Sequence, residues 1–246
     1  MFVMINILLN RPNFNEIWAY PSLQQVLLPT MHVLIMPLDK SAGWANDGIN
    51  YQKRYQKGSR IYEQLIQPFS VYQIPSENIV WFNPYQDSEY ELQQKIQQSD
   101  VIYLVGSNEE SMMQCSNDFH LKEHLNSYEG IVMGDYHGSL IMLDEYYSSN
   151  GWDDELHQGL GLLQGFQLDS SYVEDVTHLK RMIDVIEIVG KAMFCFAKKG
   201  GVIIDCGHYE LLGDAFICYN DDLDCLYQAY TDAKSRFDYY GDNGNW

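Results

Sequence analysis

Residues 130–138 have the sequence GIVMGDYHG, and this stretch decides how the fold is interpreted. Its first part, residues 130–133, is a short apolar run closed by Gly134, which is typical of a buried strand in a parallel sheet. Its second part, from Gly134 to Gly138, has the G-x-X-x-G frame of a nucleophile elbow, a tight strand-to-helix turn that glycines permit. The sequence therefore predicts that Tyr136 stands at the tip of a turn at the carboxyl end of a strand.

The chain before the elbow alternates between two kinds of pattern. Four more apolar runs of strand length lie at residues 2–9, 32–38, 78–82 and 100–105. Apolar residues at helical spacing lie at 51–66, 88–98, 112–125 and, after the elbow, 177–189. Ser88 and Glu91 have the spacing of a capping box, and Gly190 ends the last pattern. This alternation favours an α/β fold with a mostly parallel sheet.

The C-terminal part has a different pattern. Short strand-like pieces at residues 193–197, 201–205 and 215–219 are separated by glycines and indicate an antiparallel extension at one sheet edge. A final helix is expected at 223–237, followed by a polar, glycine-rich flexible tail at 239–246. Since no internal repeat or linker interrupts the chain, residues 1–238 are expected to form one α/β domain.

Composition excludes several classes of partner. Lysine and arginine number 15 and aspartate and glutamate 34, which gives a net charge of −19. A chain of this sign repels phosphate, so neither nucleic acid nor an anionic membrane surface is an expected partner. No apolar run reaches the roughly 20 residues of a membrane span, and residues 1–10 lack the features of a signal peptide. The 5 cysteines are scattered without CxxC spacing, which favours a reducing compartment, so we expect a cytoplasmic protein. No nucleotide-binding glycine motif is present, and no cofactor is expected.

Several segments resemble the serine peptidase family of peptidase E (aspartyl dipeptidase) and cyanophycinase. Residues 99–108, SDVIYLVGSN, are similar to the family's Ad.I...GGN pattern, and Gly134 and Gly138 fall on the glycines of its G-x-S-A-G elbow. Residues 159–172 and 201–214 look like its glgLl....i..H and al.v.dG....lG segments. The resemblance implies a three-layer fold like that of class I glutamine amidotransferases, a flavodoxin-like arrangement with helices on both faces of the sheet.

The catalytic positions of this family are altered in the chain. The resemblance places the nucleophilic serine at Tyr136, the following alanine at His137 and the catalytic histidine at Ser171, while the acidic partner falls at Asp154 or its neighbour Asp153. A phenol, with an ordinary pKa of about 10, is a poor nucleophile near pH 7 unless a base activates it. We expect the His137 side chain to point away from Tyr136, so that no imidazole remains beside the phenol to take a proton.

Two classes of function follow. The first is a non-catalytic pseudo-peptidase that binds a small peptide, an amino-acid-like ligand or a protein. Its binding residues are expected at the ends of two strands: Gly106, Ser107, Asn108, Gly134, Asp135, Tyr136 and His137. The second is an active hydrolase of small peptides or amides with a non-standard site, whose oxyanion donors are backbone N–H groups near Gly106, Ser107 and His137. The tyrosine-rich composition is compatible with a homodimer.

A third hypothesis is a metallohydrolase. Residues 120–124, HLKEH, match the H-x-x-E-H motif, and on a continuous helix His120 and His124 lie on one face, with Glu123 beside them. The motif needs a third ligand, which the sequence does not single out. The alternative interpretation is a solvated helix face of mixed charge.

Overall fold

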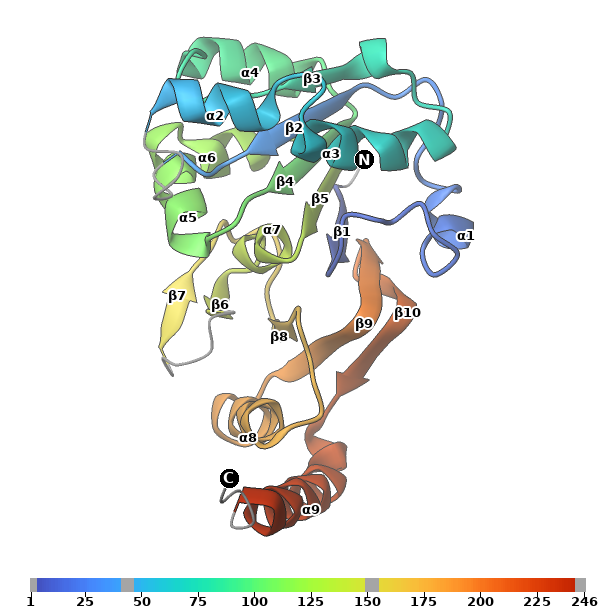
Figure 1. Ribbon diagram of the computed structural model, residues 1–246, viewed down its shortest axis with the longest axis vertical. Helices are drawn as coiled ribbons and strands as arrows, with labels where there is room; N and C mark the ends of the chain where they lie inside the picture. Colours follow the sequence, from blue (N-terminus) through green and yellow to red (C-terminus); the bar gives the residue numbers. More distant parts are fainter. Residues whose placement is uncertain (1–3, 41–46, 149–154, 242–246) are drawn as a thin grey trace.

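The computed structural model describes residues 4–40, 47–148 and 155–241, with the backbone alone at residues 237–241. In this part of the chain the centre is a mixed sheet of 8 strands (Figure 1). The five apolar runs form neighbouring parallel strands in the order β1-β5-β4-β2-β3. Their bounds are β1 (Ile5–Leu9), β2 (Val33–Pro37), β3 (Ile79–Trp81), β4 (Val101–Val105) and β5 (Ile131–Asp135). The predicted α/β fold with a mostly parallel sheet is confirmed.

A long hairpin extends the sheet beyond β1. β9 (Ala192–Asp205) pairs antiparallel with both β1 and β10 (His208–Cys218), while β8 (Phe166–Asp169) pairs parallel with the start of β9. The antiparallel extension is therefore present, but as two long strands and not as the three short pieces that the sequence predicts. The glycines at 200 and 201 do not end a strand, because Gly201 keeps its place in the ladder opposite Leu9 and Leu212.

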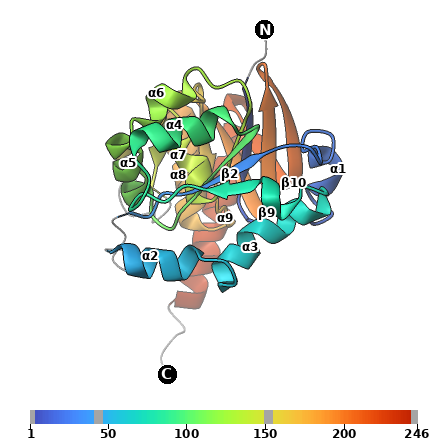
Figure 2. The ribbon, with the colours of Figure 1, turned by 90° about the horizontal axis from the view of Figure 1, so that it is seen from above.

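Helices cover both faces of the sheet and make three layers (Figure 2). α4 (Glu89–Gln97), α5 (Glu109–Asp118), α6 (Leu121–Leu125) and α7 (His137–Ile141) bury their apolar residues in a core that includes Leu34 and Met36. α1 (Tyr20–Leu23), α2 (Gly48–Tyr55) and α3 (Arg60–Val71) pack on the other face, over Val33 and Ile35. Successive strand residues point to opposite faces, so continuous apolar strands supply both cores.

Two of the predicted helices are each divided. The helix expected at 51–66 is divided into α2 and α3, because Ser59 accepts a hydrogen bond from the Tyr62 N–H and starts a new helix. The helix expected at 112–125 is divided into α5 and α6 by His120, whose φ of 48° is left-handed. The capping box of Ser88 and Glu91 is confirmed at the start of α4.

The remaining elements are helices, a small sheet and short turns, and Figure 1 shows α8 and α9 at the bottom, below the β9–β10 hairpin. The helix predicted at 177–189 is confirmed as α8 (Val176–Asp184), continued by the π-helical turn η2 (Val185–Val189) and ended by Gly190 at φ 71°. α9 (Leu223–Gly241) packs beside it after the 3-10 turn η3 (Asn220–Asp222), and a second such turn, η1 (Ser76–Asn78), precedes β3. A small sheet of β6 (Glu145–Tyr147) and β7 (Leu156–Gln158) was not expected from the sequence. Within the described ranges, every helix is too short or too polar to cross a bilayer.

Candidate functional site

The turn between β5 and α7 has the geometry of an elbow. β5 ends at Asp135, α7 begins at His137, and Tyr136 between them has φ 47° and ψ −104°. The Tyr136 N–H donates to the carbonyl oxygen of Leu9 at 2.8 Å, which ties the turn to the end of β1. The half-buried Tyr136 therefore occupies the tip, as the sequence predicts.

Steric contact explains both elbow glycines. A Cβ on Gly134 would lie 2.4 Å from the carbonyl carbon of Gly138, and a Cβ on Gly138 would lie 2.2 Å from the carbonyl oxygen of Leu104. The Ser139 hydroxyl, which is fully buried, lies 2.8 Å from the carbonyl oxygens of Leu9 and Gly134 and accepts the Leu9 N–H at 2.9 Å. Ser139 thus fastens α7 to two strands, and the glycines are required by the turn whatever residue stands at its tip.

The expectation that His137 points away from Tyr136 is wrong. Their rings meet edge to face, with centroids 4.2 Å apart and an interplanar angle of 84°. Side chains diverge between neighbours in a strand, but the positive φ of Tyr136 removes that alternation. His137 Nδ1 lies 3.0 Å from Glu109 Oε1, and both side chains are largely buried. An imidazole with a carboxylate partner therefore stands beside the phenol.

Asp39 and Glu109 are polar residues of this edge that the sequence does not single out. The buried Asp39 carboxylate accepts the Ser107 N–H at 2.7 Å, the Ser107 hydroxyl at 3.1 Å and the Tyr55 hydroxyl at 2.9 Å. Burial, and then the charge of Asp39, raise the pKa of Tyr55 well above its usual value. Strand register carries the signal: Pro37 on β2 pairs with Val105 on β4, so the residues two positions later meet beyond the strand ends.

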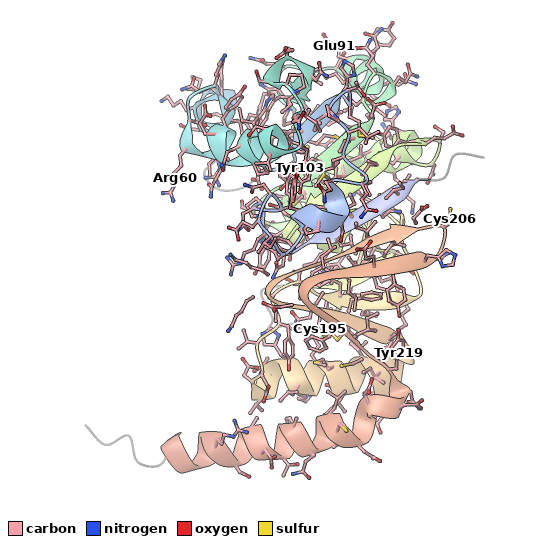
Figure 3. The ribbon with its side chains drawn as sticks, turned by 90° about the vertical axis from the view of Figure 1, so that its right-hand side faces the viewer. Arg60, Glu91, Tyr103, Cys195, Cys206 and Tyr219 are labelled. Carbon is pink, nitrogen blue, oxygen red and sulfur yellow. The ribbon has the colours of Figure 1, made fainter. Side chains whose placement is uncertain are left out.

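Asp135 faces the sheet side that holds Tyr103, which is labelled in Figure 3. The Tyr103 hydroxyl donates to Asp135 Oδ2 at 3.0 Å. Burial raises the pKa of Asp135 to about 6, although the hydrogen bond from Tyr103 and the charge of His137 act in the opposite direction. The carboxylate beside the elbow therefore takes up a proton closer to neutral pH than an exposed aspartate does.

An acidic cavity opens next to this cluster, between α5 and the small sheet of β6 and β7. It measures about 760 Å³, and its lining includes Asn108, Glu109, Glu110 and Asp118. Asn108 also caps α5, since its side-chain oxygen accepts the Ser111 N–H at 2.9 Å. One predicted binding residue, Asn108, therefore lines the cavity, and a second, His137, reaches it through Glu109.

Ser171 lies apart from these contacts, in the turn between β8 and α8. Its N–H donates to Asp169 Oδ1 at 3.0 Å, and the other oxygen of that carboxylate is paired with His178. The Asp169 contact raises the pKa of His178. The His178 imidazole thus joins α8 to β8. Asp153 and Asp154 lie outside the described residues.

The metal hypothesis has no support. His120 precedes α6 and does not lie on a continuous helix with His124. Both imidazoles lie instead near one carboxylate oxygen of Glu89, at 3.3 and 3.5 Å. Nowhere in the described ranges do three or more such side chains meet in an arrangement that could hold a metal ion. The motif that includes Glu123 is therefore a polar helix end with mixed charge.

Comparison with known proteins bears on the fold. The sequence matches no protein-family model and no curated protein. Its structure is similar to a protein of Listeria monocytogenes EGD-e named as a peptidase E, with a TM-score of 0.56 and 11% sequence identity over 84% of this chain and 98% of that one. It is also similar to a peptidase from an acI-B1 Actinobacterium, with a TM-score of 0.54 and 10% identity over 89% of this chain and 91% of the other. The chain therefore has a peptidase E-like fold.

Proposed function

We propose that this chain is a peptidase E-like protein without Ser-His peptidase chemistry, which binds a small peptide or amino-acid-like ligand beside the elbow. Its binding residues are those of the two strand ends, from Gly106 to Asn108 and from Gly134 to His137. The turn keeps its shape for the packing reasons given above, so the retained glycines are not evidence of catalysis. Support for the proposal comes from what surrounds the tip.

The observation that carries the proposal is the carboxylate of Asp39 on the Ser107 N–H. Acyl transfer builds negative charge on the substrate oxygen, and enzymes stabilise that charge with free, preorganised N–H donors. Here the amide that would serve as such a donor already faces a buried negative charge. An oxyanion at this place would meet repulsion from Asp39 and would have to displace it.

The identity of the tip residue also supports a binding role. Tyr136 carries a long aromatic side chain where the family has a short hydroxyl, and the resemblance puts Ser171, which is no base, at the histidine position. A nucleophile without a matched base loses most of the rate that a triad supplies. The tip is therefore better suited to contact a ligand than to attack one.

The acidic cavity indicates the ligand's chemistry. Glu109 is paired with His137, and Asp118 with Lys40 at 2.9 Å, but Glu110 is an exposed carboxylate at the same opening. A carboxylate prefers a cation, and the free ammonium group of a peptide or amino acid meets that requirement. A cavity of about 760 Å³ is within the size range of small-molecule sites.

Hydrolysis assays test the loss of catalysis. The purified protein should not turn over aspartyl dipeptides, and a serine-reactive fluorophosphonate should not label it. Tyr90→Phe is a matched control, since Tyr90 is an exposed tyrosine on α4. Steady turnover that Tyr136→Phe abolishes and Tyr90→Phe preserves would overturn the proposal.

Calorimetry tests the ligand. A dipeptide should bind more tightly than its N-acetylated form. Glu110→Gln should weaken the affinity for the dipeptide by about two- to fivefold, as expected for an exposed ion pair. Glu77→Gln, an exposed glutamate in η1, is the control and should have no effect. Equal binding of the free and acetylated dipeptides would contradict the ammonium assignment.

A second candidate is an active hydrolase with a non-standard site. The ring contact of His137 with Tyr136, and the Glu109 carboxylate behind that imidazole, favour it. In such an enzyme His137 would act as the base and the Tyr136 oxygen as the nucleophile. The turnover assay separates the candidates, because only the hydrolase loses activity in both Tyr136→Phe and His137→Gln.

The proposal includes the cellular compartment and the oligomeric state. All 5 cysteines are free, and three of them are buried, which suits a reducing compartment such as the cytoplasm. The homodimer stays a prediction, which the sedimentation velocity of the purified protein tests.

A further inference from the structure

A second cavity lies away from the elbow, over β1 and β9, on the face of the sheet that α4 to α7 cover. It measures about 640 Å³ and is bounded by Asn6 and Phe194 from the strands, Leu125 from the end of α6, and Phe166 after the glycine-rich loop at 159–165. Asn6 is three residues from Leu9 on β1, about 10 Å further from the carboxyl edge. The lining shares no residue with the acidic cavity or with the elbow.

The far wall comes from the β9–β10 hairpin. Figure 3 shows Cys206 at the hairpin tip and Tyr219 just after β10, both on the same side of the molecule. Tyr209 reaches Tyr219 through a contact of 3.0 Å between their hydroxyls, so the two phenols hold each other at the rim. The rings of Phe194 and Tyr209 also meet edge to face, with centroids 5.6 Å apart. Aromatic side chains therefore form a wall for a flat apolar ligand.

The charge of the lining sets this cavity apart. Every described residue that lines it is uncharged at neutral pH, although the chain as a whole carries a net charge of −19. An ionised ligand would leave water without gaining a partner of opposite charge, which is unfavourable. The uncharged lining therefore suits a neutral molecule better than an ionised one.

Asn6 gives the polar part of the recognition. Asn6 lines the cavity and is 6% exposed, and its side-chain oxygen Oδ1 is buried with no hydrogen-bond partner. Buried polar atoms in folded proteins are nearly always hydrogen-bonded, so an orphaned one at a cavity wall marks a place where a ligand donor belongs. We propose that this cavity binds a neutral, largely apolar aromatic molecule that donates one hydrogen bond to Asn6 Oδ1.

A matched pair of probes tests the proposal. N-phenyl-1-naphthylamine is neutral and carries one N–H donor, and 1-phenoxynaphthalene has an ether oxygen in that place. The amine should bind saturably with a rise in fluorescence, and it should bind about five- to tenfold more tightly than the ether, measured by competition. In Asn6→Leu the two should bind equally, whereas Asn117→Leu, in the acidic cavity, should keep the difference.

A measurement on the unaltered protein covers the case in which Asn6→Leu does not fold. Addition of the amine should shift the side-chain amide resonances of Asn6, and the ether should shift them less. Non-saturable fluorescence, equal affinity of the unaltered protein for the two probes, or a difference that survives Asn6→Leu would each overturn the proposal. None of these outcomes depends on whether the elbow binds a peptide.

Discussion

The contact between Asp39 and the β4–α5 turn can be tested by two substitutions at one position. The Asp39 carboxylate accepts three hydrogen bonds, two from Ser107 and one from Tyr55. Asp39→Ala removes all three and opens a space, whereas Asp39→Asn removes the charge and keeps one oxygen for Ser107, with an NH2 group in place of the oxygen that accepts from Tyr55. Hydrogen bonds to a charged acceptor contribute about 1.5–3 kcal/mol each, but the buried charge itself costs free energy to desolvate. We therefore expect the free energy of unfolding to fall by about 3 kcal/mol in Asp39→Ala and by about 1 kcal/mol in Asp39→Asn.

Urea denaturation followed by circular dichroism measures both changes, provided that the slope with denaturant stays constant. Amide exchange adds a local measurement: the Ser107 N–H should exchange faster in Asp39→Ala than in Asp39→Asn, because only the second variant keeps an acceptor beside it. An Asp39→Asn protein that is more stable than the unaltered chain would show that the charge is a net cost. Unchanged exchange at Ser107 in Asp39→Ala would refute the contact on which the proposed function depends.

Three further predictions concern the elbow and the β8 turn. Ser139→Ala should lower the free energy of unfolding by about 2 kcal/mol. Ser116 is an equally buried helical serine that only bonds a carbonyl of its own helix, so Ser116→Ala should lower it by less than about 1 kcal/mol. Paired denaturation curves measure both changes, and equal losses would contradict the role of Ser139 in joining α7 to the strands. Gly138→Ala should destabilise by about 2 kcal/mol despite the better helix propensity of alanine, since the Cβ clash with β4 outweighs about 1 kcal/mol of propensity, and a rise in melting temperature would oppose this. His178 has its pKa raised from 6.5 by Asp169, so its contribution to stability should be complete below about pH 6.5 and lost as the pH rises through the raised value; His178→Gln, followed in parallel from pH 5 to 9, should lack this component.

The fold was largely predictable because its signals are local. Each of the five parallel strands is a continuous apolar run, since both faces of the sheet are covered. The pattern fails where tertiary contacts override it. Apolar spacing continues through the break at His120, so periodicity alone merged α5 with α6. The glycines of β9 interrupt its apolar run and so predict two pieces, while the pairing with β1 and β10 holds the strand together.

The site was predictable only in part. The elbow follows from its glycines, but Asp39, Glu109 and the direction of His137 depend on which strands are neighbours and on one positive φ. A sequence pattern gives neither the order of the strands nor the positive φ of Tyr136. Once the order of β2, β4 and β5 is known, the residues just after each strand can be assigned to one edge.

The same edge explains how packing maintains the elbow whatever residue stands at its tip. Gly134 and Gly138 are required by close packing, and Ser139 is required by the strands that it joins, so the turn is maintained by stability alone. The tip residue is not under that constraint, because Tyr136 contributes only its backbone to the tie with Leu9. Substitution at the tip is therefore compatible with the fold, and the Tyr136 side chain can be changed to test ligand binding without disturbing the turn. Tyr136→Ala should change the free energy of unfolding by no more than about 1 kcal/mol while it weakens binding of the dipeptide. A large loss of stability would show that the ring is part of the packing and not of a binding site.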